Sequence, residues 1–227
     1  MYKFEIHLHT NACSACGVSS AEEMIDAAIE KGYSGVVFTN HFYHGNTCID
    51  RNLPWEEFVG AYEKDYLRAK EYGEKKGIKV FFGVEEGYDA GKEMLIYGLS
   101  TDTFKNCPEF IMMGANEKAD FVHKNGGLTV CAHPFRDRAY IPEPDKEPPI
   151  HLFDGIECFN FYNKPEENEK AFLFAEKTGL IKTSGGDVHN KSGFGNAGID
   201  FNVPINTYED FIENLKGRNY KLIMKED

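Results

Sequence analysis

The sequence predicts an α/β fold in which a mostly parallel sheet is covered by helices, either as a barrel or as an open doubly wound fold. Short apolar stretches with strand character alternate with longer stretches whose apolar residues recur at helical spacing. The chain of 227 residues is 41% hydrophobic and 14% aromatic, so it can bury a sizeable core. Because single α/β barrels commonly have this length, we expect one domain over residues 1–227.

Local signals place the elements in order along the chain. Ser20 and Glu23 form a capping box that starts a helix running through Lys31, and Gly32 ends it. Pro54 opens a long helix that ends near Gly77. Further helices are expected at 108–124, 166–178 and 208–216. Strands are expected at 3–8, 35–39, 79–84, 94–99, 128–132, 155–159, 180–184 and 220–224.

Two segments lack such a pattern. The stretch IPEPDKEPPI at 141–150 is rich in proline and charge, which indicates an exposed loop. The stretch SGFGNAG at 192–198 is rich in glycine without the spacing of a phosphate-binding motif. We interpret it as a flexible loop of the active site.

Charge and composition exclude several classes of protein. With 37 acidic against 25 basic residues the formal net charge is −12, which argues against a stable nucleic-acid partner. The N-terminal residues lack the features of a signal peptide, and no apolar run is long enough to cross a bilayer. The six cysteines are scattered through a chain too large to need a disulfide framework. A reduced, cytoplasmic protein without a membrane partner is expected, and the sequence does not indicate its oligomeric state.

The stretch FEIHLHT places His7 and His9 two residues apart, on one face of an extended strand. Alone, this pair could be two surface histidines of an edge strand. However, residues of metal-ligand type also follow other predicted strands: His41, Glu85, His133, Asp187 and His189. Because the carboxyl ends of parallel barrel strands converge on one face, the pattern predicts a site for zinc, manganese or iron.

The ordered motifs HLH (7–9), TNH (39–41), GVE (83–85), AHP (132–134) and GGDVH (185–189) resemble those of the PHP (polymerase and histidinol phosphatase) domain family. The resemblance covers nearly the whole chain. It implies a distorted (β/α)7 barrel with two or three divalent metal ions at its carboxyl-terminal face, and hydrolysis of phosphate esters. The ligands that it implies are His7, His9, His41, Glu85, His133, Asp187 and His189.

The chain departs from the family pattern in three places. Asn40 stands where the family usually has aspartate, and it can still accept a hydrogen bond beside the site. Glu93 takes the position of a ligating histidine in the strand EMLIYG. The segment CSAC at 13–16 replaces an acidic residue or a histidine. A third metal would therefore depend on His41 and His189, completed by a phosphate oxygen or by a thiolate; otherwise the two cysteines are reduced loop residues near the site.

Other residues near these strand ends have two interpretations each. Arg136 can hold a substrate phosphate bidentately or form a surface salt bridge. His44 can be a proton donor or a surface loop residue. Glu157 and Asn160, which follow the strand GIECF, can support the ligands or contact the substrate.

The resulting hypothesis is a metal-dependent phosphatase of a small phosphorylated metabolite, histidinol-phosphate-like or nucleotide-like. Glu85 or Asp187 is expected to bridge two metals, and Arg136 to stabilise charge on the phosphoryl oxygens. Asp187 or a nearby histidine is expected to protonate the leaving group. The alternatives are a PHP-type phosphodiesterase or exonuclease, and a non-catalytic metal-binding module.

Overall fold

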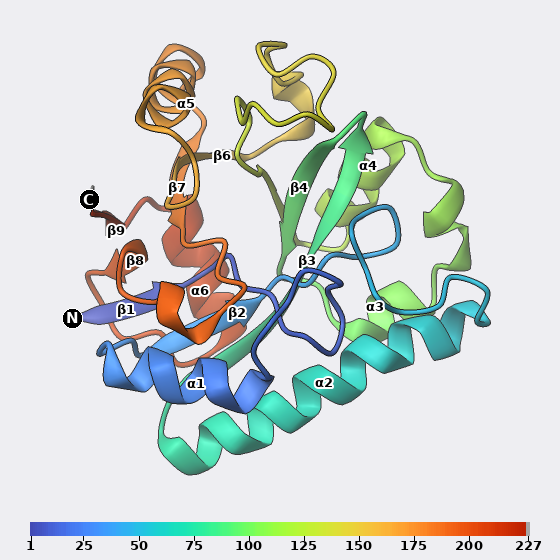
Figure 1. Ribbon diagram of the computed structural model, residues 1–227, viewed down its shortest axis with the longest axis vertical. Helices are drawn as coiled ribbons and strands as arrows, with labels where there is room; N and C mark the ends of the chain where they lie inside the picture. The colour runs from blue at the N-terminus through green and yellow to red at the C-terminus, as the bar shows by residue number, and fades with distance from the viewer. Residues whose placement is uncertain (226–227) are drawn as a thin grey trace.

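The computed structural model describes residues 1–225 and contains a nine-stranded sheet with the order β7-β6-β5-β4-β3-β2-β1-β8-β9 (Figure 1). The strands are β1 (Tyr2–Glu5), β2 (Gly35–Phe38), β3 (Lys79–Asp89), β4 (Lys92–Tyr97), β5 (Leu128–Cys131), β6 (Gly155–Asn160), β7 (Ile181–Gly185), β8 (Ala197–Phe201) and β9 (Tyr220–Met224). The helices are α1 (Ala21–Glu30), α2 (Trp55–Lys76), α3 (Thr101–Lys105), α4 (Ala115–Lys124), α5 (Pro165–Thr178) and α6 (Tyr208–Lys216), with short 3-10 turns at Pro108–Met112, Ile150–Leu152 and Lys191–Gly193.

The sheet curls until its two halves meet, which makes a nearly closed barrel. Just beyond β1 and β7, Leu8 pairs in parallel with Val188. Within β7, the Ser184 hydroxyl donates to the carbonyl oxygen of Ile223 in β9 at 2.5 Å. The same hydroxyl accepts from the Gly198 N–H in β8 at 3.2 Å. The predicted class, a distorted α/β barrel, is confirmed. The family resemblance implied seven strands and the sequence pattern predicted eight, including β9; the additional strand is β8.

The sheet is less parallel than predicted. Parallel pairs join β1 to β2, β2 to β3, β5 to β6 and β6 to β7. The four remaining pairs, β3 with β4, β4 with β5, β1 with β8 and β8 with β9, are antiparallel. Between β3 and β4 the chain has only Ala90 and Gly91, too short for the crossover that parallel strands need.

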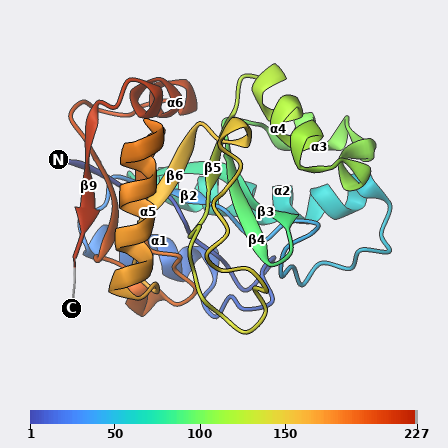
Figure 2. The ribbon, with the colours of Figure 1, turned by 90° about the horizontal axis from the view of Figure 1, so that it is seen from above.

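Helices cover the outside of the barrel. Figure 1 shows α1 and α2, in blue and cyan, side by side along one flank. Their apolar residues Met24, Ile25 and Ala69 pack with Val36 of β2 and Val80 of β3. Seen from above, α5 lies beside β6 on another flank (Figure 2). Phe104 of α3 meets Phe121 of α4, with ring centroids 6.0 Å apart.

The barrel interior is filled by apolar side chains. Phe4 stacks with Phe81 at a ring-centroid distance of 5.8 Å and meets Phe201 edge-on at 5.6 Å. The fully buried Tyr97 donates its hydroxyl to the carbonyl oxygen of Ile6 at 2.9 Å. This core supports the segment that carries His7 from below.

Most predicted boundaries are confirmed, and two predictions are wrong. Ser20 caps α1 with the expected capping box, and Gly77 ends α2 in the left-handed conformation. The helix predicted at 108–124 is broken before Gly114, because Glu117 accepts a hydrogen bond from the Gly114 N–H and starts α4 anew. The segment 192–198, predicted as an active-site loop, contributes its last residues to β8 instead.

Within residues 1–225, no helix combines the length and the apolar character that crossing a bilayer requires.

We expect Ser184→Ala to lower the free energy of unfolding by about 1–3 kcal/mol, because it removes two hydrogen bonds, one to the half-buried Ile223 carbonyl and one from the Gly198 N–H, each worth about 0.5–1.5 kcal/mol. Urea denaturation measures the change. The control is Ser192→Ala, an exposed serine whose loss should cost about 0.5 kcal/mol or less. Equal effects of the two substitutions would show that this seam does not stabilise the barrel.

Candidate metal centre

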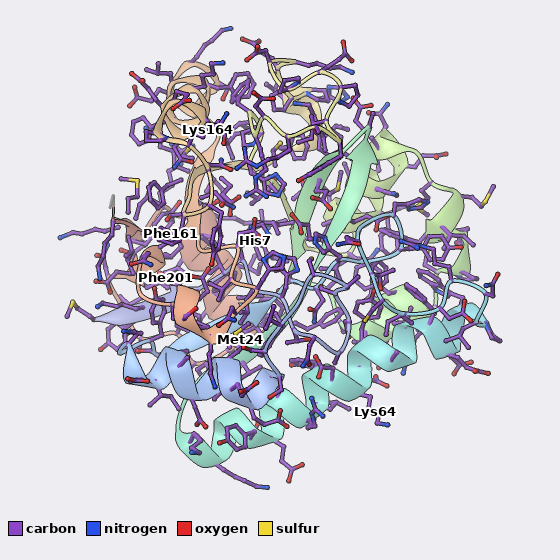
Figure 3. The ribbon with its side chains drawn as sticks, in the orientation of Figure 1. His7, Met24, Lys64, Phe161, Lys164 and Phe201 are labelled. Carbon is purple, nitrogen blue, oxygen red and sulfur yellow. The ribbon has the colours of Figure 1, made fainter. Side chains whose placement is uncertain are left out.

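The structure brings all eight predicted metal-ligand residues together at one end of the barrel. They fall into four overlapping groups of three, and within each group the potential ligand atoms lie within 4.8 Å of one another. The groups are His9–His41–His189, His7–His9–Glu85, His7–His133–Asp187 and His41–Glu85–Glu93. Figure 3 shows His7 near the middle of the molecule, whereas Lys64 and Lys164 lie at its periphery.

Backbone pairing explains how distant residues meet. Beside the Leu8–Val188 pair, the His9 N–H donates to the Val188 carbonyl at 2.9 Å, and the Val188 N–H donates to the His7 carbonyl at 3.0 Å. Residues on either side of a paired position share one face of the strand. His7 and His9 therefore lie beside Asp187 and His189, and the rings of His9 and His189 stack with centroids 4.3 Å apart.

Glu85 occupies the centre of the cluster. It lies within β3 and is fully buried, and its backbone pairs in parallel with that of His41. Its Oε1 lies 2.9 Å from His133 Nε2 and 3.2 Å from His7 Nε2. Its Oε2 lies 2.9 Å from His41 Nδ1 and 3.4 Å from His9 Nε2. Each oxygen of one carboxylate thus faces a different pair of imidazoles.

Glu93 reaches the same end of the barrel from the opposite chain direction. It lies near the start of β4, and β4 runs antiparallel to β3, so its first residues lie beside the far end of β3. Its Oε1 is 3.1 Å from His41 Nδ1, and its Oε2 is 3.7 Å from His133 Nε2. His41 therefore belongs to two groups, one with Glu85 and Glu93 and one with His9 and His189.

Two of the candidate ligands hold a strained backbone conformation. Within residues 1–225, positive φ angles at non-glycine residues occur at His133 (28°), Asp187 (49°) and Arg218 (55°). Such conformations persist where surrounding structure enforces them, and they concentrate at functional sites. The adjacent Gly185 is required for space, because a Cβ there would lie 2.4 Å from Glu157 Oε1 and 2.6 Å from the Cβ of His7.

Polar side chains behind the cluster fix the imidazoles. Glu157 Oε1 lies 2.8 Å from His7 Nδ1, and Ser14 Oγ lies 3.1 Å from His9 Nδ1. Asn40 Oδ1 accepts from Ser14 Oγ at 3.0 Å, so Asn40 acts beside the site as expected from its amide. Since one ring nitrogen of each histidine is held from behind, the other is directed into the cluster.

Sequence reasoning missed Glu5, which organises the backbone beneath the cluster. Its Oε1 accepts from the N–H groups of Ile6, His7 and Gly186 at 2.8–3.0 Å, which ties the end of β1 to the end of β7. Burial raises the pKa of Glu5 to about 8. The alternation Glu5, His7, His9 along one strand face was the available signal.

The electrostatics of the cluster balance carboxylates against imidazoles. Burial disfavours a charge on His7, yet the neighbouring carboxylates, Glu157 first, raise the pKa of His7 well above its ordinary value. Burial also disfavours a charge on Glu85, but the surrounding imidazoles, His7 first, hold its pKa well below its ordinary value. Buried carboxylates that are ionised at neutral pH need positive charge beside them, and a divalent cation can provide it in place of the imidazole protons.

The unsatisfied atoms fit a metal centre. Within residues 1–225, the buried side-chain nitrogen and oxygen atoms without a hydrogen-bond partner are His7 Nε2, His9 Nε2, His41 Nδ1, Glu85 Oε2 and Glu5 Oε2. Four of these five belong to the cluster and point at one another. Unpaired buried polar atoms are costly, and imidazole nitrogens with carboxylate oxygens are the ligands of zinc, manganese and iron.

The PHP domain family model matches residues 5–216, a range that includes all eight candidate ligands. The chain belongs to the PHP domain family. No curated protein matches the chain.

Solved structures share the fold of this PHP domain at low sequence identity. A two-domain protein from Bacteroides vulgatus, which contains a predicted PHP-like metal-dependent phosphoesterase, aligns with a TM-score of 0.75 and 17% identity over 99% of this chain and 65% of its own. PsfC from Pseudomonas syringae aligns with a TM-score of 0.62 and 14% identity over 99% of this chain and 93% of its own. The lesion-specific endonuclease PfuEndoQ from Pyrococcus furiosus aligns with a TM-score of 0.68 and 14% identity over 97% of this chain and 57% of its own. The PHP domain thus spans less than two thirds of the first and third of these proteins.

Arg136 is buried in this PHP domain and pairs with a candidate ligand. Its Nη2 donates to Asp187 Oδ2 at 2.7 Å and to Asn160 Oδ1 at 2.8 Å, and its Nε donates to Asn163 Oδ1 at 2.8 Å. The interpretation as a surface salt bridge is therefore wrong, because the ion pair is buried. Burial opposes ionisation of Asp187, but His7 and Arg136 hold the pKa of Asp187 well below its ordinary value, which disfavours the expected role of Asp187 as a proton donor.

The remaining residues that the sequence singled out lie in different places. Several of the candidate ligands border a cavity, the metal pocket, which is lined by Cys16, His41, Asn46, Glu93, His133, Arg136, Tyr140, Asp187 and His189. His44 is not among these residues; its Nδ1 is 2.5 Å from Glu86 Oε1 and 3.1 Å from Lys118 Nζ. Cys16 lines that pocket. Burial raises the pKa of the Cys16 thiol, but hydrogen bonds with His189 and His41 outweigh this and lower it to about 6.

We expect Glu157→Gln to weaken metal binding by about 10–100-fold, because an amide cannot replace both oxygens that hold His7 Nδ1 and the His133 N–H. Chelator competition on the purified protein measures the affinity. The control is Glu167→Gln, a buried carboxylate that accepts from the backbone of Lys164 and Asp137, away from the ligands. Unchanged affinity in Glu157→Gln would remove this residue from the support of the site.

Proposed function

We propose that this PHP domain is a hydrolase that cleaves the phosphate monoester of a small metabolite, using two or three divalent cations (zinc, manganese or iron). The observation that carries the proposal is the position of Glu85. Its Oε1 faces His7 and His133, and its Oε2 faces His9 and His41. A carboxylate with ligands on both sides is suited to bridge two cations. By contrast, Asp187 gives one oxygen to Arg136, so we assign the bridge to Glu85 rather than to Asp187.

Bound around Glu85, divalent cations supply Lewis acidity toward phosphoryl oxygens and a water of lowered pKa. The chain itself provides the orientation. The Arg136 guanidinium is fixed by Asp187, Asn160 and Asn163, and it lines the pocket. Because it is held on two of its nitrogens, it can donate from Nη1 to a phosphoryl oxygen without losing its orientation.

In a form of the site with two bound cations, where His189 binds none, His189 is the best candidate to protonate the leaving group. Its Nδ1 lies 2.7 Å from the Asp187 carbonyl oxygen, which fixes the ring and leaves Nε2 for the pocket. Its side chain is 25% exposed, so the ring can exchange protons with solvent. An imidazole with one nitrogen fixed and the other accessible is a typical general acid.

The size of the pocket supports a small substrate. Its volume is about 370 Å³, at the lower end of the range for small-molecule sites. The residues that line it are Cys16, His41, Asn46, Glu93, His133, Arg136, Tyr140, Asp187 and His189. The ring of Tyr140 is 61% exposed and offers a surface on which an imidazole or a nucleobase can stack. This favours a histidinol-phosphate-like or nucleotide-like substrate.

The loop that carries Tyr140 is fastened to the barrel. Buried Lys92, the neighbour of Glu93, donates from Nζ to the carbonyl oxygens of Pro134 at 2.9 Å and Lys146 at 3.1 Å. Through these bonds, one ammonium group holds both ends of the loop 134–146. Both ends of the loop are therefore held in place, and Tyr140 between them lines the pocket.

Cleavage of a phosphodiester is the main alternative, since PfuEndoQ shares the fold. The net charge is −12, and among the residues that line the pocket Arg136 is the one arginine or lysine; both observations disfavour a stable nucleic-acid partner. A non-catalytic metal-binding role is disfavoured by the complete set of candidate ligands. We propose a small phosphorylated substrate and, from the free state of the six cysteines, a cytoplasmic location.

The test compares para-nitrophenyl phosphate with bis-para-nitrophenyl phosphate on protein loaded with zinc, manganese or iron. We expect turnover of the monoester to exceed that of the diester. Preference for the diester would favour the nuclease-like alternative, and no turnover of either ester with metal bound would favour the non-catalytic one.

We further expect His9→Ala and Asp187→Ala each to reduce monoester turnover by more than about 100-fold and to lower the bound metal, since a ligand matters more than the residues behind it. Circular dichroism should show an intact fold, because the core consists of apolar side chains. His151→Ala, on an exposed turn, is the control. Full activity in either site variant would exclude that residue as a metal ligand.

A further inference from the structure

Cys16 is held between two candidate metal ligands by the backbone. On one side, the hydroxyl of Ser14 accepts from the His41 N–H at 3.0 Å. On the other side, the Val18 N–H donates to the His189 carbonyl at 2.8 Å. Cys16 lies midway between these two attachments, and it lines the same pocket as His41 and His189.

The turn that carries Cys16 is tightly constrained. The Ala15 N–H donates to the Asn46 carbonyl at 2.8 Å, and the Gly17 N–H donates to the Ser14 carbonyl at 3.0 Å. A Cβ at Gly17 would lie 2.2 Å from the carbonyl oxygen of Thr10, so glycine permits this close turn. The thiol is therefore delivered to a defined position.

The other two cysteines nearby do not reach the cluster. Cys13 is fully buried in an apolar cluster that includes Phe42, Phe58 and Tyr62. Cys48 is exposed, and its thiol lies 3.3 Å from the Ala12 carbonyl oxygen. Of the two cysteines in the CSAC segment, the structure thus singles out Cys16.

An independent observation points to a ligand at this place. The potential ligand atoms of His9, His41 and His189 lie within 4.8 Å of one another, without a carboxylate in their group. Buried His9 Nε2 and His41 Nδ1 have no hydrogen-bond partner among residues 1–225. The carboxylates that approach these rings, Asp187 at 3.2 Å from His9 Nε2 and Glu85 at 2.9 Å from His41 Nδ1, belong to the neighbouring groups of candidate ligands. A further cation beside His41 and His189 therefore gains an anionic ligand of its own from the pocket lining or from a bound anion.

We infer that Cys16 supplies this ligand as a thiolate, and that with His41 and His189 it forms a soft metal site that prefers zinc or cobalt to manganese. This inference rests on the proposed function, because it concerns the same metal centre. Thiolate and imidazole ligands suit zinc, whereas manganese prefers carboxylate and water oxygens. On binding, the thiol proton leaves to solvent and a sulfur–metal bond forms.

The test loads metal-free protein with cobalt under anaerobic conditions and records the near-ultraviolet thiolate-to-cobalt charge-transfer band. We expect the band in the wild type and in Cys48→Ser, and its loss in Cys16→Ser. With manganese present, the dissociation constant of the most weakly bound zinc should be at least about tenfold higher in Cys16→Ser than in the wild type. A band that persists in Cys16→Ser, or that is absent from the wild type, would overturn the inference.

A second measurement avoids dependence on the folding of Cys16→Ser. In Cys48→Ser, Cys16 is the one cysteine that is not buried, so a thiol-reactive disulfide reagent should label one thiol per chain. Cobalt should suppress that labelling; unchanged labelling with cobalt bound would contradict thiolate ligation. Neither readout uses phosphatase activity, so a failure of the proposed function is recognised separately by the ester assay.

Discussion

The pairing of Leu8 with Val188 is the constraint on which the metal centre depends. It joins the segment that follows the first strand to the segment that follows the seventh strand, although these segments lie far apart in the sequence. Two motifs with ligands at alternate positions thereby become neighbours, and His7 and His9 face Asp187 and His189. Glu5 reinforces the join from below by accepting N–H groups of both segments. Without this closure, each motif would be an isolated pair on a strand end.

Closure also creates the electrostatic condition for binding a cation. It buries several carboxylates among imidazoles, with Glu85 at the centre and completely removed from solvent. The barrel core of aromatic and aliphatic side chains holds these groups in place, so they cannot separate to reach water. Positive φ angles at His133 and Asp187 indicate that the surrounding structure enforces the arrangement. A cation bound here would replace protons rather than reorganise the site.

Much of the candidate site followed from the sequence because its signals are local. Alternation of side chains along a strand places His7 and His9 on one face, and the same holds for Asp187 and His189. Glu93 was predicted as a ligand from the family resemblance, because it does not follow the carboxyl end of a parallel strand. It meets the others because β4 runs antiparallel to β3. The segment 85–93 between the two expected strands is too short for a parallel crossover, and this was the available signal for the direction of β4. Ser14 was missed because a serine in a loop has no distinctive pattern. Glu5 was missed although its alternation with His7 and His9 places it on the same strand face.

Local sequence signals specify the helix limits at Ser20 and Gly77, the positions of most strands and the alternate spacing of the ligands. These features depend on neighbours within a few residues, through caps, turns and side-chain alternation. By contrast, the central position of Glu85, the pairing of Arg136 with Asp187 and the approach of Cys16 rather than Cys13 to the metal pocket are seen first in the folded molecule. The same holds for β8, which exists because β1 offers it a partner edge. These outcomes depend on hydrogen bonds and burial between residues that are distant in the chain, which no local pattern encodes.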